Sequence, residues 1–68
     1  MNVDLTGYKV IYKDRVLRAL ALIDTWLTRK EDDTTVIEKL TVLYINEAGV
    51  IDVLVGEPKE FQFIPIIV

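Results

Sequence analysis

A chain of 68 residues with a net charge of −3 has room for one domain, which we place over residues 1–68. It contains no cysteine, histidine or serine. Their absence excludes a disulfide framework, thiolate and imidazole metal sites, and the serine and cysteine nucleophiles of most hydrolases. A domain this small that has neither disulfides nor a metal often depends on a partner subunit, so we expect oligomerisation.

The charge is unevenly distributed along the chain. Residues 1–30 carry six basic and three acidic side chains, a net +3, whereas residues 31–68 carry two basic and eight acidic ones, a net −6. These opposite charges predict electrostatic complementarity for head-to-tail association. Residues 1–7 lack the pattern of a signal peptide, and no apolar stretch approaches the roughly 18 residues of a membrane span. We therefore expect a cytoplasmic protein with no membrane segment.

The first predicted strand covers residues 8–13, where alternate side chains would share a face. Residues 15–30 fit two structures. Apolar side chains at helical spacing, in a segment rich in leucine, alanine and arginine, favour an amphipathic helix. Paired instead with residues 8–13 through a turn at Lys13 and Asp14, the same segment would be a buried strand. That turn lacks the Asn-Gly typical of a two-residue hairpin loop, so both interpretations stay open.

The second half of the chain predicts a hairpin. Residues 31–35 have no apolar periodicity and indicate a solvated loop. Residues 36–45 are rich in β-branched and aromatic side chains and predict a strand, and residues 50–55 predict its antiparallel return. Residues 46–49 between them fit a type I turn followed by Gly49 in the left-handed conformation.

A last strand follows a second turn. Residues 56–59 predict a turn or a single helical turn, with Pro58 fixing φ and Gly56 free to adopt a positive φ. Residues 61–68 predict the last strand. Pro65 within it cannot donate a hydrogen bond to a sheet ladder, which indicates that this strand lies at a sheet edge or leaves the sheet there.

Several short segments carry a resemblance to known proteins: Tyr8-Lys9-Val10-Ile11-Tyr12, Ala19-Leu20-Ala21-Leu22-Ile23, Ile45-Asn46-Glu47-Ala48-Gly49, Gly56-Glu57 and Phe61-Gln62-Phe63-Ile64. Over most of residues 8–64 the chain resembles uncharacterised short proteins of bacterial mobile elements and phages. The resemblance implies that the segment after Asp14 is a strand in an SH3-like arrangement. The expected fold is therefore mainly β, a small five-stranded SH3-like barrel of two hairpins and a closing strand. The alternative is an α+β fold with residues 15–30 as a helix packed on an antiparallel sheet.

The titratable side chains do not indicate an enzyme. Glu47 and Asp52, or Glu57 and Glu60, are the carboxylate pairs closest in sequence, but acidic residues beside turns are usually solvated, and a fold this small rarely builds a desolvated cleft. The acidic run at residues 31–33 lacks the spacing of a calcium loop. We expect no catalytic residues, no metal and no cofactor.

The excess of apolar side chains predicts a non-enzymatic protein–protein interaction module that acts as a homo-oligomer through exposed strand edges. The resemblance further implies that such a module would be an accessory or inhibitor protein of a phage or mobile element. The candidate interface residues are Trp26, Phe61, Phe63, Ile64, Ile66 and Ile67. Core packing is the competing interpretation for the three aromatic residues. If Phe61 and Phe63 face the core, then Gln62 and Ile64 face outward.

The alternative function is nucleic-acid binding, because small β-barrels often present basic and aromatic side chains together on one face. The acidic pI near 4.7 disfavours it, since most of the acidic side chains would repel phosphates. The candidate nucleic-acid contacts are Lys9, Lys13, Arg15 and Arg18, which lie close in sequence to Tyr8 and Tyr12.

Overall fold

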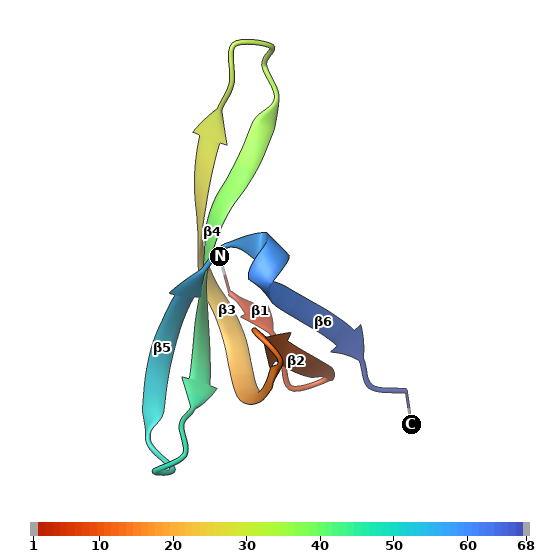
Figure 1. Ribbon diagram of the computed structural model, residues 1–68, viewed down its shortest axis with the longest axis vertical. Coiled ribbons are helices and arrows are strands. Elements are labelled where there is room, and N and C mark those ends of the chain that lie inside the picture. The colour runs from red at the N-terminus through yellow and green to blue at the C-terminus, as the bar shows by residue number, and fades with distance from the viewer. Residues whose placement is uncertain (1, 68) are drawn as a thin grey trace.

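The computed structural model describes residues 2–67, and these consist mostly of antiparallel strands (Figure 1). The prediction of a mainly β fold is confirmed, and the alternative helix over residues 15–30 is wrong. The elements in chain order are β1 (Val3–Asp4), β2 (Tyr8–Tyr12), β3 (Arg15–Arg29), β4 (Thr35–Ile45), β5 (Ile51–Gly56), a 3₁₀ turn η1 (Pro58–Glu60) and β6 (Phe61–Pro65).

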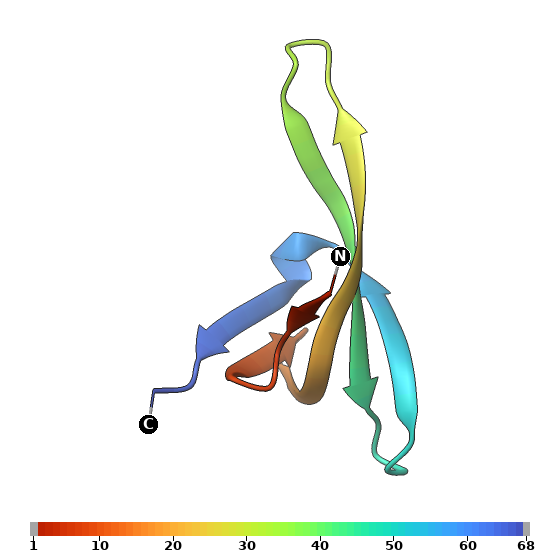
Figure 2. The same cartoon turned by 180° about the vertical axis from the view of Figure 1, so that it is seen from behind.

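The strands form one sheet in the order β5-β4-β3-β2-β6, and the short β1 also pairs with β3. The five predicted strands are thus joined by a sixth. Within residues 2–67, β5 and β6 do not pair with each other, so the sheet is open. It folds around β3, with β5 and β6 on opposite sides (Figures 1 and 2), and the distal half of the β3–β4 hairpin projects as an arm that contributes to a longest dimension of 42 Å.

Bulges explain why β3 has the pattern of a helix. The register against β4 shifts once between Ala19 and Ala21 and again between Leu22 and Asp24. Each shift adds one residue to β3 and turns the following side chains to the other face of the strand. As a result Leu17, Ala19 and Leu22 all pack against the core, at spacings of two and three residues that overlap the helical period of 3.6.

The turn between β2 and β3 forms without the glycine that its backbone favours. Tyr12 pairs with Arg15, and the two residues between them, Lys13 and Asp14, have φ of 47° and 66°. This left-handed conformation costs free energy for side chains other than glycine. Interactions of Lys13 offset the cost: its Nζ lies 3.0 Å from the Glu60 carboxylate and 5.3 Å from the centre of the Tyr12 ring, and its N–H donates to the Glu60 carbonyl.

The predicted turn of the second hairpin is confirmed. Gly49 has a φ of 78°, and its N–H donates to the Asn46 carbonyl over 2.9 Å. The Asn46 side-chain oxygen accepts hydrogen bonds from the N–H groups of Ala48 and Val50. The predicted sheet-edge position of Pro65 is confirmed as well, because β6 is the last strand of the sheet.

The fully buried part of the core is small and lies where β2, β4 and β6 meet under β3. Gly56 is needed there for space and not for a positive φ, which it does not adopt. A Cβ at this position would lie 2.8 Å from Cε1 of Tyr12 and 2.9 Å from Cε2 of Phe61. The buried hydrophobic side chains are Leu5, Val10, Leu40, Val42 and Phe61.

Gly56→Ala is expected to lower the free energy of unfolding by about 1–3 kcal/mol, because the added methyl group displaces two core rings. Urea denaturation followed by Trp26 fluorescence measures the change. Gly7→Ala is the matched control: a Cβ at Gly7 meets nothing within 4 Å, so a change below about 0.5 kcal/mol is expected. Equal effects of the two substitutions would contradict the packing role.

Asp14→Gly is expected to raise the free energy of unfolding by about 0.5–1 kcal/mol, since glycine adopts the left-handed conformation without a Cβ clash. The same denaturation experiment on Gly49→Ala should show a loss of similar size. A destabilising Asp14→Gly would show that the Asp14 side chain, and not the backbone, controls this turn.

Candidate protein-interaction surface

The β4–β5 hairpin carries apolar side chains on both faces of the sheet. On the inner face, Leu40 and Val42 are buried and Leu54 packs against them. Side chains that alternate with these point to the opposite face, which no other element covers in residues 2–67. We call this the outer face, and it consists of Ala21 on β3, Leu43 and Ile45 on β4, and Ile51, Val53 and Val55 on β5.

The three β5 side chains of the outer face are the most exposed part of it. Ile51, Val53 and Val55 are 61%, 52% and 49% exposed, although an antiparallel sheet needs only one apolar face to fold. β5 is also the end strand of the sheet, and its pairing with β4 runs without a register shift. It has none of the lysines, prolines or bulges that protect natural edge strands, and Asp52 is its one charged side chain.

Charged side chains stand at both ends of the outer face. Arg18 pairs in register with Ile45 at one end, and Asp24 pairs with Thr41 at the other. Both are exposed, and neither makes an ion pair with another residue of the described range 2–67. Trp26 follows Asp24 by two residues without a bulge between them, so it lies on the same face, at the base of the arm.

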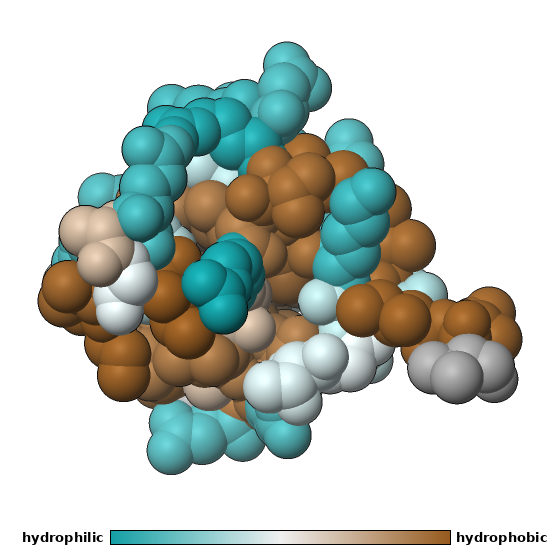
Figure 3. All heavy atoms as spheres, turned by 90° about the horizontal axis from the view of Figure 1, so that it is seen from below, coloured by the Kyte–Doolittle hydropathy of each residue, from teal (hydrophilic) through white to brown (hydrophobic). Residues whose placement is uncertain are grey.

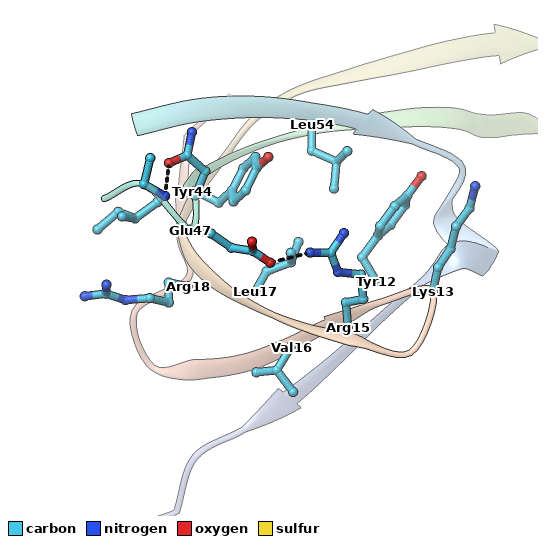
Figure 4. A pocket seen from close by; sticks show the side chains of 12 residues that line it. Tyr12, Lys13, Arg15, Val16, Leu17, Arg18, Tyr44, Glu47 and Leu54 are labelled. Carbon is cyan, nitrogen blue, oxygen red and sulfur yellow. Dashed lines mark hydrogen bonds and ion pairs between the residues drawn. The ribbon is translucent and has the colours of Figure 1, made fainter. Parts of the chain in front are cut away.

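A cleft opens between the β2–β3 turn and the β4–β5 turn (Figure 4). Leu17, Tyr44 and Leu54 point into it, and Arg15 joins the two turns through a 2.8 Å ion pair with Glu47. From below, hydrophobic side chains occupy the middle of the molecule between hydrophilic ones (Figure 3).

The six predicted interface residues do not come together. Phe61 is buried, and its ring lies 4.8 Å from that of Tyr12 and 5.7 Å from that of the half-buried Phe63. Core packing is thus the correct interpretation for both phenylalanines, and Gln62 faces outward as expected. Core packing is wrong for Trp26, which is 59% exposed on β3.

The other predicted interface residues lie at the opposite end of the sheet from β5. Ile64, Ile66 and Ile67 are exposed at the end of β6 and beyond it. The N–H of Ile66 donates to the Gly7 carbonyl, which ties this segment to the start of β2. Val68, which the predicted last strand included, lies outside the described residues.

The four basic residues proposed for nucleic-acid contact are not free as a group. Lys13 pairs with Glu60, and Arg15 pairs with Glu47. Lys9 lies on β2 opposite Ile64, whereas Arg18 stands at one end of the outer face. The two ion pairs join residues 1–30 to residues 31–68 within one chain, so part of the predicted complementarity between the halves is used inside the fold.

Sequence reasoning missed Ile51, Val53 and Val55 as functional candidates. The signal was present: β-branched side chains at every second position of a strand whose other face already carries Leu54. An antiparallel hairpin with apolar side chains on both faces needs a cover on each.

Glu60 connects the first turn to the start of β6. Its carboxylate accepts a hydrogen bond from the Glu57 N–H over 2.9 Å and pairs with Lys13. The hydrogen bond from Glu57, and then Lys13, lower the pKa of Glu60, and the Glu60 carboxylate raises the pKa of Lys13. A carboxyl group with a lowered pKa stabilises the fold above its unfolded pKa, and this contribution is lost as the pH falls through the folded pKa.

Glu60→Gln is therefore expected to destabilise the protein at neutral pH and to have a progressively smaller effect in acid, as the wild-type carboxylate becomes protonated too. Thermal unfolding across this pH range measures the difference between the two proteins. The matched control is Glu31→Gln, because Glu31 makes no hydrogen bond or ion pair through its side chain in the described range. A constant difference between wild type and Glu60→Gln at all pH values would contradict the ionic role.

Residues 2–67 contain no group of three or more carboxylates placed to hold a metal ion. No helix in that range is long and apolar enough to cross a membrane. Comparison of the chain with protein-family models, curated proteins and solved structures found no match.

Proposed function

We propose that this chain is a non-enzymatic protein–protein interaction module whose contact surface is the outer face of β3, β4 and β5. The observation that carries the proposal is the exposure of Ile51, Val53 and Val55 on an end strand whose opposite face is already packed. Exposed apolar patches of this kind mark interaction sites, because leaving them in water costs free energy.

The total exposed surface supports the same function. A folded monomer of 7.8 kDa exposes about 4,400 Å². This chain exposes 5199 Å², which is about 800 Å² more. The excess reflects the open sheet and its projecting arm, and it includes the uncovered apolar side chains of β5.

The fold and the biological setting belong to the proposal as well. Two hairpins followed by β6, which pairs back onto β2, support an SH3-like arrangement. The resemblance to short proteins of bacterial mobile elements and phages supports an accessory or inhibitor protein that acts in the cytoplasm.

The test places the photo-crosslinking amino acid p-benzoylphenylalanine at position 53 in cells that produce the protein. A crosslinked protein product is expected, and adding Val55→Asp to the same chain should reduce its yield at least tenfold, because a charge then enters the contact. The control is the same crosslinker at Glu31, on the arm tip, with little product expected.

A failure to crosslink protein from position 53 would contradict the outer face as a contact surface. Tight binding of DNA or RNA at physiological salt, lost when Lys9 and Arg18 are changed to glutamate, would instead support the nucleic-acid alternative.

A further inference from the structure

Resting on the proposed function, we propose that the partner is a second copy of this chain. The two copies pack outer face to outer face about a two-fold axis perpendicular to their strands. Arg18 of each copy then lies opposite Asp24 of the other.

The register of the sheet makes the outer face self-complementary. Apolar side chains fill the middle of the face, and the charges stand at its two ends. The outer face and the polar side chains at its ends form three rows across β3, β4 and β5, namely Arg18, Ile45 and Ile51; Ala21, Leu43 and Val53; and Asp24, Thr41 and Val55.

The charges at the two ends select the orientation. With the two-fold axis perpendicular to the strands, the strands of the two copies run in opposite directions and the Arg18 end of one copy covers the Asp24 end of the other. With the axis along the strands, β3 of one copy would cover β5 of the other, so Arg18 would face Ile51 and Asp24 would face Val55. Covering a charged side chain with an apolar one leaves the charge without a partner and costs free energy, so the first orientation is favoured.

Trp26 extends the contact in this orientation. It lies beyond Asp24, at the base of the arm that projects from the sheet (Figure 1). In this orientation Trp26 lies beyond Arg18 of the other copy. Val16, which is 63% exposed, is two residues before Arg18 on the same face of β3, so the indole reaches an apolar side chain. Exposed tryptophans that become buried are frequent centres of binding free energy.

Face-to-face packing covers the apolar side chains of β5, whereas edge-to-edge pairing would leave them exposed to solvent. A β5 to β5 edge contact would satisfy backbone N–H and C=O groups, but Ile51, Val53 and Val55 would still point into solvent. The folded chain also needs this cover to add to its core, because only five hydrophobic side chains are buried in the described part of the chain. A second copy can supply this cover as part of folding, since obligate homodimers often have no stable folded monomer.

The experiment is sedimentation equilibrium on the purified chain over micromolar concentrations. Wild type should form dimers, with a blue shift of Trp26 fluorescence on association. Arg18→Asp and Asp24→Arg should each weaken dimerisation at least tenfold. Mixing the two variants should restore association close to wild type, because each arginine then meets an aspartate in the mixed dimer.

The mixture separates a specific contact from general charge attraction. Each substitution changes the charge by two, so the variants carry −5 and −1 against −3 for wild type, and both remain negative. Lys9→Asp is the matched control for Arg18→Asp, since it makes the same charge change on β2 and should leave the dissociation constant unaltered. Circular dichroism checks that all variants keep the strand content of wild type.

If the chain forms dimers but neither Arg18→Asp nor Asp24→Arg changes the dissociation constant, the face-to-face contact is overturned in favour of edge pairing. A strict monomer that still crosslinks another protein from position 53 would overturn the second copy as partner and leave the proposed function standing. A strict monomer with no crosslink at position 53 would overturn both.

Discussion

β3 and β4 pair from Arg18 opposite Ile45 to Arg29 opposite Thr35, and the other strands depend on this hairpin. β5 pairs with β4, β1 and β2 pair with β3, and β6 pairs with β2. A two-stranded ribbon is marginally stable by itself, so the hairpin in turn needs the side chains that the shorter strands bring beneath it. The core therefore sits at the middle of the hairpin, and the contacts of the arm beyond it, within residues 2–67, are mainly between its own two strands.

The same hairpin explains why the molecule has an unused surface. A sheet this small can fold its strands over one face only, and here the inner face takes β2, β6 and the ring of Phe61. The outer face still carries Leu43, Ile45 and the exposed side chains of β5. Each would gain free energy from cover, in proportion to the apolar area removed from water. The packing of the chain itself therefore supports the proposed contact with another protein.

Charge acts locally in this fold as well as at the outer face. Lys13 forms an ion pair with Glu60 across the first turn, and Arg15 forms one with Glu47 across the cleft. Such exposed pairs each contribute little to stability, yet together they hold two turns whose positions define the open end of the sheet. Arg18 has no such intramolecular partner in the described range, which is why its place at the end of the outer face carries information about association.

The sequence alone determined the hairpin of residues 36–55 and its turn with Gly49, because these depend on alternation and on local turn geometry. It left Phe61 open between core packing and an interface. It did not decide residues 15–30. Two bulges in β3 move apolar side chains to spacings of two and three residues, and only pairing with β4 shows that these belong to a strand. The outer face was hidden for the same reason. Alternation in β5 says that Val53 faces away from Leu54, but only the tertiary structure decides which face is covered, since that depends on where β2 and β6 fold.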